Sequence, residues 1–152
     1  MYFGFESCKP DRGYVSLAGT DTILKMERIL IETGDIRLSA ELNESETAKA
    51  IYDLLPLTGS AIIWGEEIYF SIPLHLEQSR DARMEVRVGE LGFWPAGDAF
   101  CIFFGPTPVS QNDQPMAYSP VNVFGSIQGD PGVLRKVVSG DTIRVSREEI
   151  KS

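Results

Sequence analysis

Glycine and proline divide this chain into short apolar segments, most of them about the length of a single β-strand. The clearest is Ile36–Leu42, in which apolar and polar residues alternate. A period of two is typical of a half-buried strand, with one face toward a core. Gly34-Asp35 separates this segment from a similar one at residues 27–33, so the pair predicts a β-hairpin.

Further strand-like segments follow. The other expected strands are residues 60–64, 68–72, 84–88, 91–94, 99–104, 121–127 and 142–146. The run at 99–104 is apolar throughout, as expected of a strand that is buried on both faces. Two short helices are also expected, one capped by Asn43 and stopped by Pro56, the other beginning at Pro131. Residues 105–120 contain four prolines and predict a long loop of the kind that is often functional.

Many short strands with two scattered helices predict a mainly β fold, a closed antiparallel β-barrel with two short helices. The barrel domain is expected over residues 26–147, with a C-terminal tail at 148–152. Residues 1–25 have weak periodicity and are interpreted as an N-terminal extension or an accessory edge strand. Because the clear pattern begins at Met26, a natural start at that residue is a further hypothesis, which mass spectrometry of the native N-terminus would test.

Composition excludes several classes of function. The 152 residues include 14 Lys and Arg against 22 Asp and Glu, a net charge of −8 at pH 7. Nucleic-acid binders need a basic face to displace counterions from phosphates, so no nucleic-acid partner is expected. A bilayer span needs roughly 20 apolar residues, and no stretch approaches that length, so no membrane partner is expected either. The N-terminus lacks a signal-peptide pattern, which makes a cytoplasmic location the expectation.

Residues that hold metals or act as nucleophiles are scarce. Cys8 and Cys101 are the only cysteines, and His75 is the only histidine. These are too few for a disulfide scaffold, a Cys-based zinc site or a His-rich site, so no metal and no cofactor is expected. His75 beside Glu77 suggests a general base, but a lone histidine in a polar loop is more often exposed, and no catalytic residue is predicted. Glu66-Glu67 is interpreted as solvated charge at a hairpin tip.

Several stretches resemble a known family. Residues 29–41 look like the opening hairpin of the cyclophilins, and residues 121–127 look like the strand before their last helix. Longer segments are similar to the atypical cyclophilin-like family of bacteria and archaea, whose function is uncharacterised: WGEEIYF at 64–70, GFWPAGDAFCIFFGPTP at 92–108 and SPVNVFG at 119–125. The resemblance covers roughly residues 26–146 and implies a β-barrel of cyclophilin-like type.

The resemblance does not extend to the isomerase chemistry of true cyclophilins. Those enzymes use an arginine to stabilise the twisted prolyl amide, in a groove with aromatics, a glutamine and a histidine. Trp64 falls near the position of that arginine, and no arginine lies between Gly59 and Gln78. The loop at 105–120, where the histidine would fall, contains none. The isomerisation barrier is about 18–20 kcal/mol and a catalyst must favour the rotated state, so we expect weak or absent isomerase activity.

The resemblance also implies a ligand groove at the position of the cyclophilin site. The candidate lining residues are Trp64, Tyr69, Trp94, Phe103, Phe104, Pro106 and Asn122. Each has a plainer interpretation, since the aromatic rings suit a barrel core, Pro106 suits a rigid strand exit, and Asn122 suits a bond to loop backbone. Alternate residues of a strand face opposite ways, so only one of Phe103 and Phe104 can face the groove.

Together these features favour a binding module that holds a small molecule or an extended, proline-containing peptide in an aromatic groove. Two alternatives stay open. One is a peptidyl-prolyl cis-trans isomerase. The other is a subunit of a metabolic enzyme complex, by fold-level analogy with cyclophilin-like halves of amide-hydrolysing assemblies. The ligand and the oligomeric state do not follow from the sequence.

Overall fold

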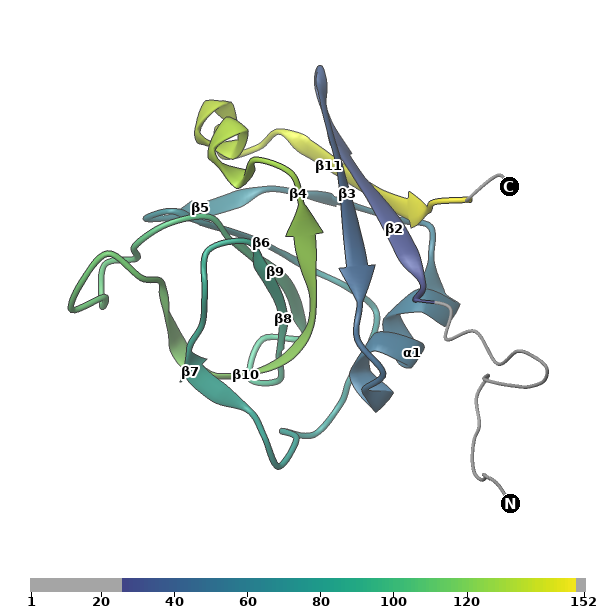
Figure 1. Cartoon of the computed structure of the whole chain (residues 1–152), viewed down its shortest axis with the longest axis horizontal. Coiled ribbons are helices and arrows are strands. Elements are labelled where there is room, and N and C mark those ends of the chain that lie inside the picture. The colour runs from purple at the N-terminus through teal and green to yellow at the C-terminus, as the bar shows by residue number, and fades with distance from the viewer. Residues whose placement is uncertain (1–25, 150–152) are drawn as a thin grey trace, which may run out of the picture.

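The computed structural model describes residues 26–149, and the predictions for residues 1–25 and 150–152 lie outside this range. The first half of this part contains β2 (Arg28–Thr33), β3 (Ile36–Leu42), α1 (Glu46–Leu54), β4 (Leu57–Ser60), β5 (Ile62–Trp64) and β6 (Glu67–Ser71). The second half contains β7 (Arg83–Glu85), β8 (Glu90–Trp94), β9 (Ala99–Phe103), β10 (Met116–Gln128), the 3₁₀ helix η1 (Pro131–Lys136) and β11 (Thr142–Arg147). The prediction of a mainly β fold with two short helices is confirmed (Figure 1).

The strands form one antiparallel sheet that curls on itself (Figure 1). Its order is β4-β11-β2-β3-β10-β8-β9-β6-β5, with β7 paired to β10 off this path. The sheet is not closed by hydrogen bonds, so the predicted closed barrel is not confirmed. The strands at its two ends, β4 and β5, follow each other in the chain and are separated only by Ala61. One residue is too short a connection for the chain to reverse, so β4 and β5 cannot form hydrogen bonds with each other. Ala61 instead bonds through its backbone to Gly140 and Asp141, where the segment passes from β11 to β6.

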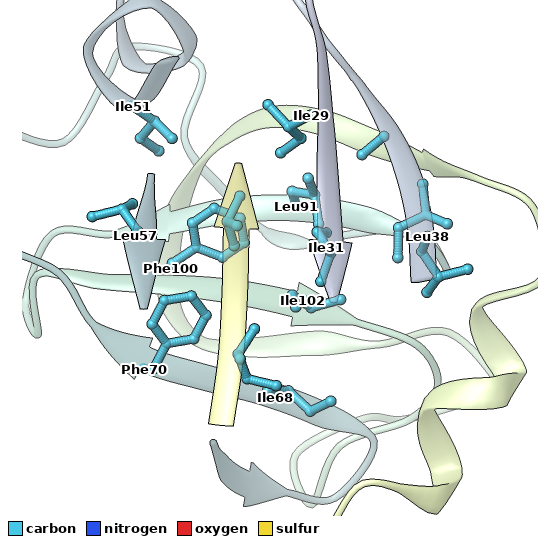
Figure 2. Packing of buried hydrophobic residues seen from close by; sticks show 14 of the residues in the cluster. Ile29, Ile31, Leu38, Ile51, Leu57, Ile68, Phe70, Leu91, Phe100 and Ile102 are labelled. Carbon is cyan, nitrogen blue, oxygen red and sulfur yellow. The ribbon is translucent and has the colours of Figure 1, made fainter. Parts of the chain in front are cut away.

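The sheet carries a hydrophobic cluster on each face. The larger cluster fills the interior of the curled sheet and includes Phe70, Phe100 and Ile102 (Figure 2). Cys101 and Phe103 lie in a smaller cluster, which also contains Val86, Ala99, Ala117 and Val121. Strand β9 is buried along its whole length because both of its faces are covered, as its apolar composition predicts.

The segment after β9 differs from the prediction. The expected loop at 105–120 ends early, because β10 begins at Met116 and runs through Pro120. Its first part pairs with β7, and the register shifts between Met116 and Val121. Proline cannot donate to a strand ladder, and an irregular register of this kind accommodates it. The early start brings residues 117–121 across the outer face of the sheet, beside the smaller cluster.

Helix α1 is capped by a different residue from the one predicted. The Oγ of Ser45 accepts the hydrogen bond from the backbone N–H of Ala48, so Ser45 is the N-cap. Asn43 has another role, since its side-chain oxygen accepts from Ser45 and its amide donates to the carbonyl of Val123. The helix ends at Leu54, as Pro56 predicts.

Candidate functional site

A pocket of about 190 Å³ opens beside the smaller cluster, where β5, β6 and β8 meet the start of β10. Its lining residues are Trp64, Glu67, Tyr69, Trp94, Ala117, Tyr118 and Val121. Three of the predicted groove residues, Trp64, Tyr69 and Trp94, are therefore brought together. They come from three different strands of the same curled sheet, β5, β6 and β8, with β9 lying between β6 and β8.

Four aromatic rings surround the pocket in a chain of near-perpendicular contacts. The ring centroids of Trp64 and Tyr118 are 6.1 Å apart with an interplanar angle of 80°. Those of Tyr118 and Trp94 are 6.2 Å apart at 85°, and those of Trp94 and Tyr69 are 6.2 Å apart at 78°. This is the edge-to-face geometry that aromatic pairs favour, and it leaves no two of these rings stacked face to face. Tyr118, 68% exposed, forms the rim.

The indole of Trp94 is held in place on two sides. Its Nε1–H donates a hydrogen bond to Ser119 Oγ at 2.6 Å. Gly97 lies against the ring, and a Cβ at that position would overlap the indole carbons. The small residue in the turn between β8 and β9 thus lets the backbone approach the ring closely. Contacts within the protein therefore fix the orientation of the Trp94 ring at the edge of the pocket.

Glu67 is the polar residue of the pocket, and its interpretation as solvated charge at a hairpin tip was wrong. The turn ends at Glu66, and Glu67 begins β6 with only 5% of its surface exposed. In β6, Ile68 and Phe70 point into the main core, so the alternate residues Glu67 and Tyr69 face the pocket. Glu66 behaves as predicted of a surface charge, pairing with Arg135 at 2.9 Å.

The buried position changes the chemistry of the Glu67 carboxyl group. Burial disfavours the ionised form and raises the pKa of Glu67 to about 7, although an interaction with the Cys101 thiol lowers it in part. Within residues 26–149, no lysine, arginine or histidine forms an ion pair with Glu67. Burial and the nearby Glu67 raise the pKa of Cys101, so this thiol is protonated and unreactive at neutral pH. Glu67 is thus a carboxyl group that can exist in either protonation state near pH 7.

The two phenylalanines among the predicted groove residues do not line the pocket. Phe103 has no exposed surface and lies in the smaller cluster, whereas Phe104 is 3% exposed and lies in the main core. They face opposite ways, as strand geometry requires. Phe103 therefore contributes to the pocket only by packing in the cluster that contains the lining residues Ala117 and Val121.

Pro106 and Asn122 also lie outside the pocket lining. The carbonyl of Pro106 accepts a hydrogen bond from the backbone N–H of Glu66 at 2.9 Å and so supports the β5–β6 turn. Asn122 is 2% exposed, and its side chain accepts from Ser79 N–H at 2.8 Å and donates to the Glu77 carbonyl at 3.0 Å. The side chain of Asn122 thus ties down the loop before β7, which is the plainer of its two interpretations.

His75 lies on the surface, apart from the pocket residues. Its Nδ1 is 2.8 Å from Asp98 Oδ1, and its Nε2 is 3.4 Å from Glu77 Oε2. The hydrogen bond to Asp98 and the charge of Asp98 raise the pKa of His75, and Glu77 adds to this effect. The arrangement is an exposed ion cluster, and it gives no support to a general base.

Two further findings concern metals and membranes. In the part of the chain that the structure describes, no three His, Cys, Asp or Glu side chains are grouped as they would be around a metal ion. None of the helices described is both long and apolar enough to cross a bilayer.

Four pocket residues were missed by the analysis of the sequence: Glu67, Ala117, Tyr118 and Val121. The position of Glu67 had a usable signal, because it alternates with the apolar residues Ile68 and Phe70. Tyr118 had none, since it lies in a proline-rich stretch with no clear period. Its place in the pocket depends on how β10 pairs with β7 and β8.

Comparisons with known proteins agree with this architecture. A family model described as cyclophilin-like matches residues 27–146. A hypothetical protein from Archaeoglobus fulgidus, with a known solution structure, is 34% identical, and the match covers 81% of this chain and 95% of that one, with a TM-score of 0.69. A search of curated proteins found no match.

Proposed function

Because the chain belongs to the cyclophilin-like family, we propose that it binds a small molecule or an extended peptide in the aromatic pocket, with little or no prolyl isomerase activity. The observation that carries the proposal is the convergence of Trp64, Tyr69 and Trp94 on one partly open pocket. Membership of the family does not name the ligand, since one fold can host unrelated functions. The ligand must be inferred from the pocket.

The composition of the pocket suits a binding site. Ligand sites are typically lined by apolar and aromatic side chains with a few polar groups that orient the ligand. Here one buried carboxyl group, that of Glu67, lies among aromatic and small apolar residues. The volume of about 190 Å³ is below the roughly 300–1,000 Å³ of sites for drug-sized molecules. The pocket therefore fits one side chain of a peptide or the head of a small molecule.

Binding is expected to change tryptophan fluorescence, because Trp64 and Trp94 are the only tryptophans of the chain and both line the pocket. Titration with proline-containing peptides and a metabolite library should give a saturable change in emission for at least one ligand. Tyr118→Ala should weaken that ligand about three- to tenfold through the loss of one aromatic contact. Val138→Ala, another exposed apolar position, is the control and should leave the affinity unchanged. Equal affinities for both variants would argue against this pocket.

Prolyl isomerase activity is expected to be indistinguishable from the uncatalysed rate. No arginine lines the pocket, and the indole N–H of Trp94 is already bonded to Ser119. The pocket thus has no cationic group, and the neutral donor of Trp94 is already occupied, so neither is available to favour the rotated amide over the ground state. A protease-free assay on an Ala-Pro peptide measures this directly. A rate that rises in proportion to protein concentration, and falls in Trp94→Ala, would show that the protein is an isomerase.

A further inference from the structure

We propose that the aromatic pocket recognises a cation, namely a substituted ammonium group that the rings of Trp64, Trp94 and Tyr118 surround and the Glu67 carboxylate neutralises. This inference rests on the proposed function, because it names the chemical class of the ligand that the same pocket takes. It follows from the arrangement of the rings, from the unpaired acid among them and from the charge of the chain.

The arrangement of the rings is the first argument. A cation is attracted to the face of a tryptophan or tyrosine ring when it lies within about 6 Å of the ring centroid. The centroids of Trp64 and Tyr118, and of Tyr118 and Trp94, are 6.1 and 6.2 Å apart. Rings packed edge to face at this separation leave no room between them, but a group inside the small pocket that they line can lie near more than one ring. Because the ring planes are nearly perpendicular, the rings can contact a ligand from different directions. This arrangement suits a rounded ammonium head with several small substituents.

The unpaired acid is the second argument. A buried charge is costly unless an opposite charge or hydrogen bonds compensate it. Glu67 is 5% exposed, and no basic side chain in residues 26–149 pairs with it. Its neighbour Glu66, by contrast, has Arg135 as a partner. The interaction with the Cys101 thiol compensates the Glu67 carboxylate only in part, and an ammonium ligand would provide the positive charge that it lacks.

Charge and size agree with this assignment. The net charge of −8 at pH 7 raises the local concentration of cations around the protein and repels anions. The volume of about 190 Å³ suits one ammonium head, and the exposed Tyr118 at the rim leaves a way out for the rest of the ligand. An anionic ligand would be repelled by both the acidic surface and the Glu67 carboxylate.

Titration with choline and with its uncharged isostere tests the inference. The isostere is the dimethylbutanol in which a quaternary carbon replaces the nitrogen, so the two probes share shape and differ in charge. Tryptophan fluorescence and calorimetry at pH 8 should show saturable binding of choline and binding of the isostere that is on the order of tenfold weaker. Glu67→Gln should weaken choline by a similar factor and leave the isostere nearly unchanged. Glu66→Gln, which removes a neighbouring carboxylate outside the pocket, should change neither affinity.

Three outcomes would overturn the inference. They are equal affinity for choline and its isostere, choline binding that Glu67→Gln does not weaken, and no saturable binding of choline at all. The first two would leave the proposed binding function intact, because the pocket would still hold a ligand. In the third case, titration with neutral metabolites and proline-containing peptides decides whether the proposed function also fails. Circular dichroism and thermal melting of Glu67→Gln confirm that the variant is folded, so that its loss of binding can be attributed to charge.

Discussion

Replacing Glu67 with glutamine is expected to stabilise the folded protein at pH 8 by about 3 kcal/mol and to change its stability little at pH 4. Burial raises the pKa of this carboxyl group from 4.5 to about 7. Between these two values the folded state keeps a proton that the unfolded state has released. The free energy of unfolding therefore falls as the pH rises through this window, and the loss persists above it. Glutamine is neutral at every pH and avoids that loss.

Urea denaturation of the wild type and of Glu67→Gln at several pH values between 4 and 8 measures this effect. The difference between the two proteins isolates Glu67, because the other titratable groups are common to both. Glu66→Gln is the matched control, since that carboxylate is partly exposed and paired with Arg135. Its pH profile should follow that of the wild type. If the profiles of Glu67→Gln and the wild type ran parallel from pH 4 to pH 8, the carboxyl group would not be held in its protonated form by burial.

Phe100→Ala is expected to lower the free energy of unfolding by about 3–5 kcal/mol, through lost burial and the cavity that remains. Phe100 has no exposed surface and lies beside Phe70 in the main core (Figure 2). Its ring stacks on Phe70 with centroids 5.1 Å apart, and it meets Phe124 edge to face at the same distance. Domains of this kind are stable by only about 5–15 kcal/mol, so the variant should be close to unfolding.

Chemical denaturation of Phe100→Ala and of Phe100→Leu checks this expectation. Leucine keeps most of the apolar volume and should cost clearly less than alanine. Phe100 lies on the opposite face of β9 from Cys101 and Phe103, which belong to the cluster beside the pocket. The folded fraction of either variant should therefore keep the tryptophan emission of the wild type. A loss below about 1 kcal/mol for alanine would mean that the core collapses readily around the missing ring.

Much of the local structure could be predicted because its causes are local. Alternating side chains over Ile36–Leu42 predict a strand with one buried face, and β3 has these bounds. Gly34 in the turn before it has a φ of 57°, a conformation that glycine adopts readily. Pro56 and Pro131 mark the end of one helix and the start of the other, because a proline ring restricts φ and removes a donor. In each case residues close together in the chain carry the signal.

Features that depend on pairing between strands far apart in the sequence were harder to predict. The closed barrel was expected from the number of strands, but whether the ladder closes depends on how the ends of the sheet meet, at the bend around Ala61. The start of β10 was assigned to a loop because of its prolines. Its partner β7 is far away in the sequence, and the strand expected at 84–88 carried no sign of how the two would pair. This error removed Ala117 and Tyr118 from the expected pocket, whereas Val121 fell in an expected strand and was not recognised as a pocket residue.

The order of residues was enough to establish a mainly β chain with two short helices, its acidity and its resemblance to the cyclophilin-like family, because periodicity, composition and motifs are properties of neighbouring residues. The spatial arrangement was needed to show that Trp64, Tyr69 and Trp94 share one pocket, and that Glu67 is buried among them instead of solvated. A side chain's exposure depends on what covers it. The residues that line the pocket with Glu67 include Ala117, Tyr118 and Val121 of β10, which begins some fifty residues further along the chain and is placed there by its pairing with β7 and β8.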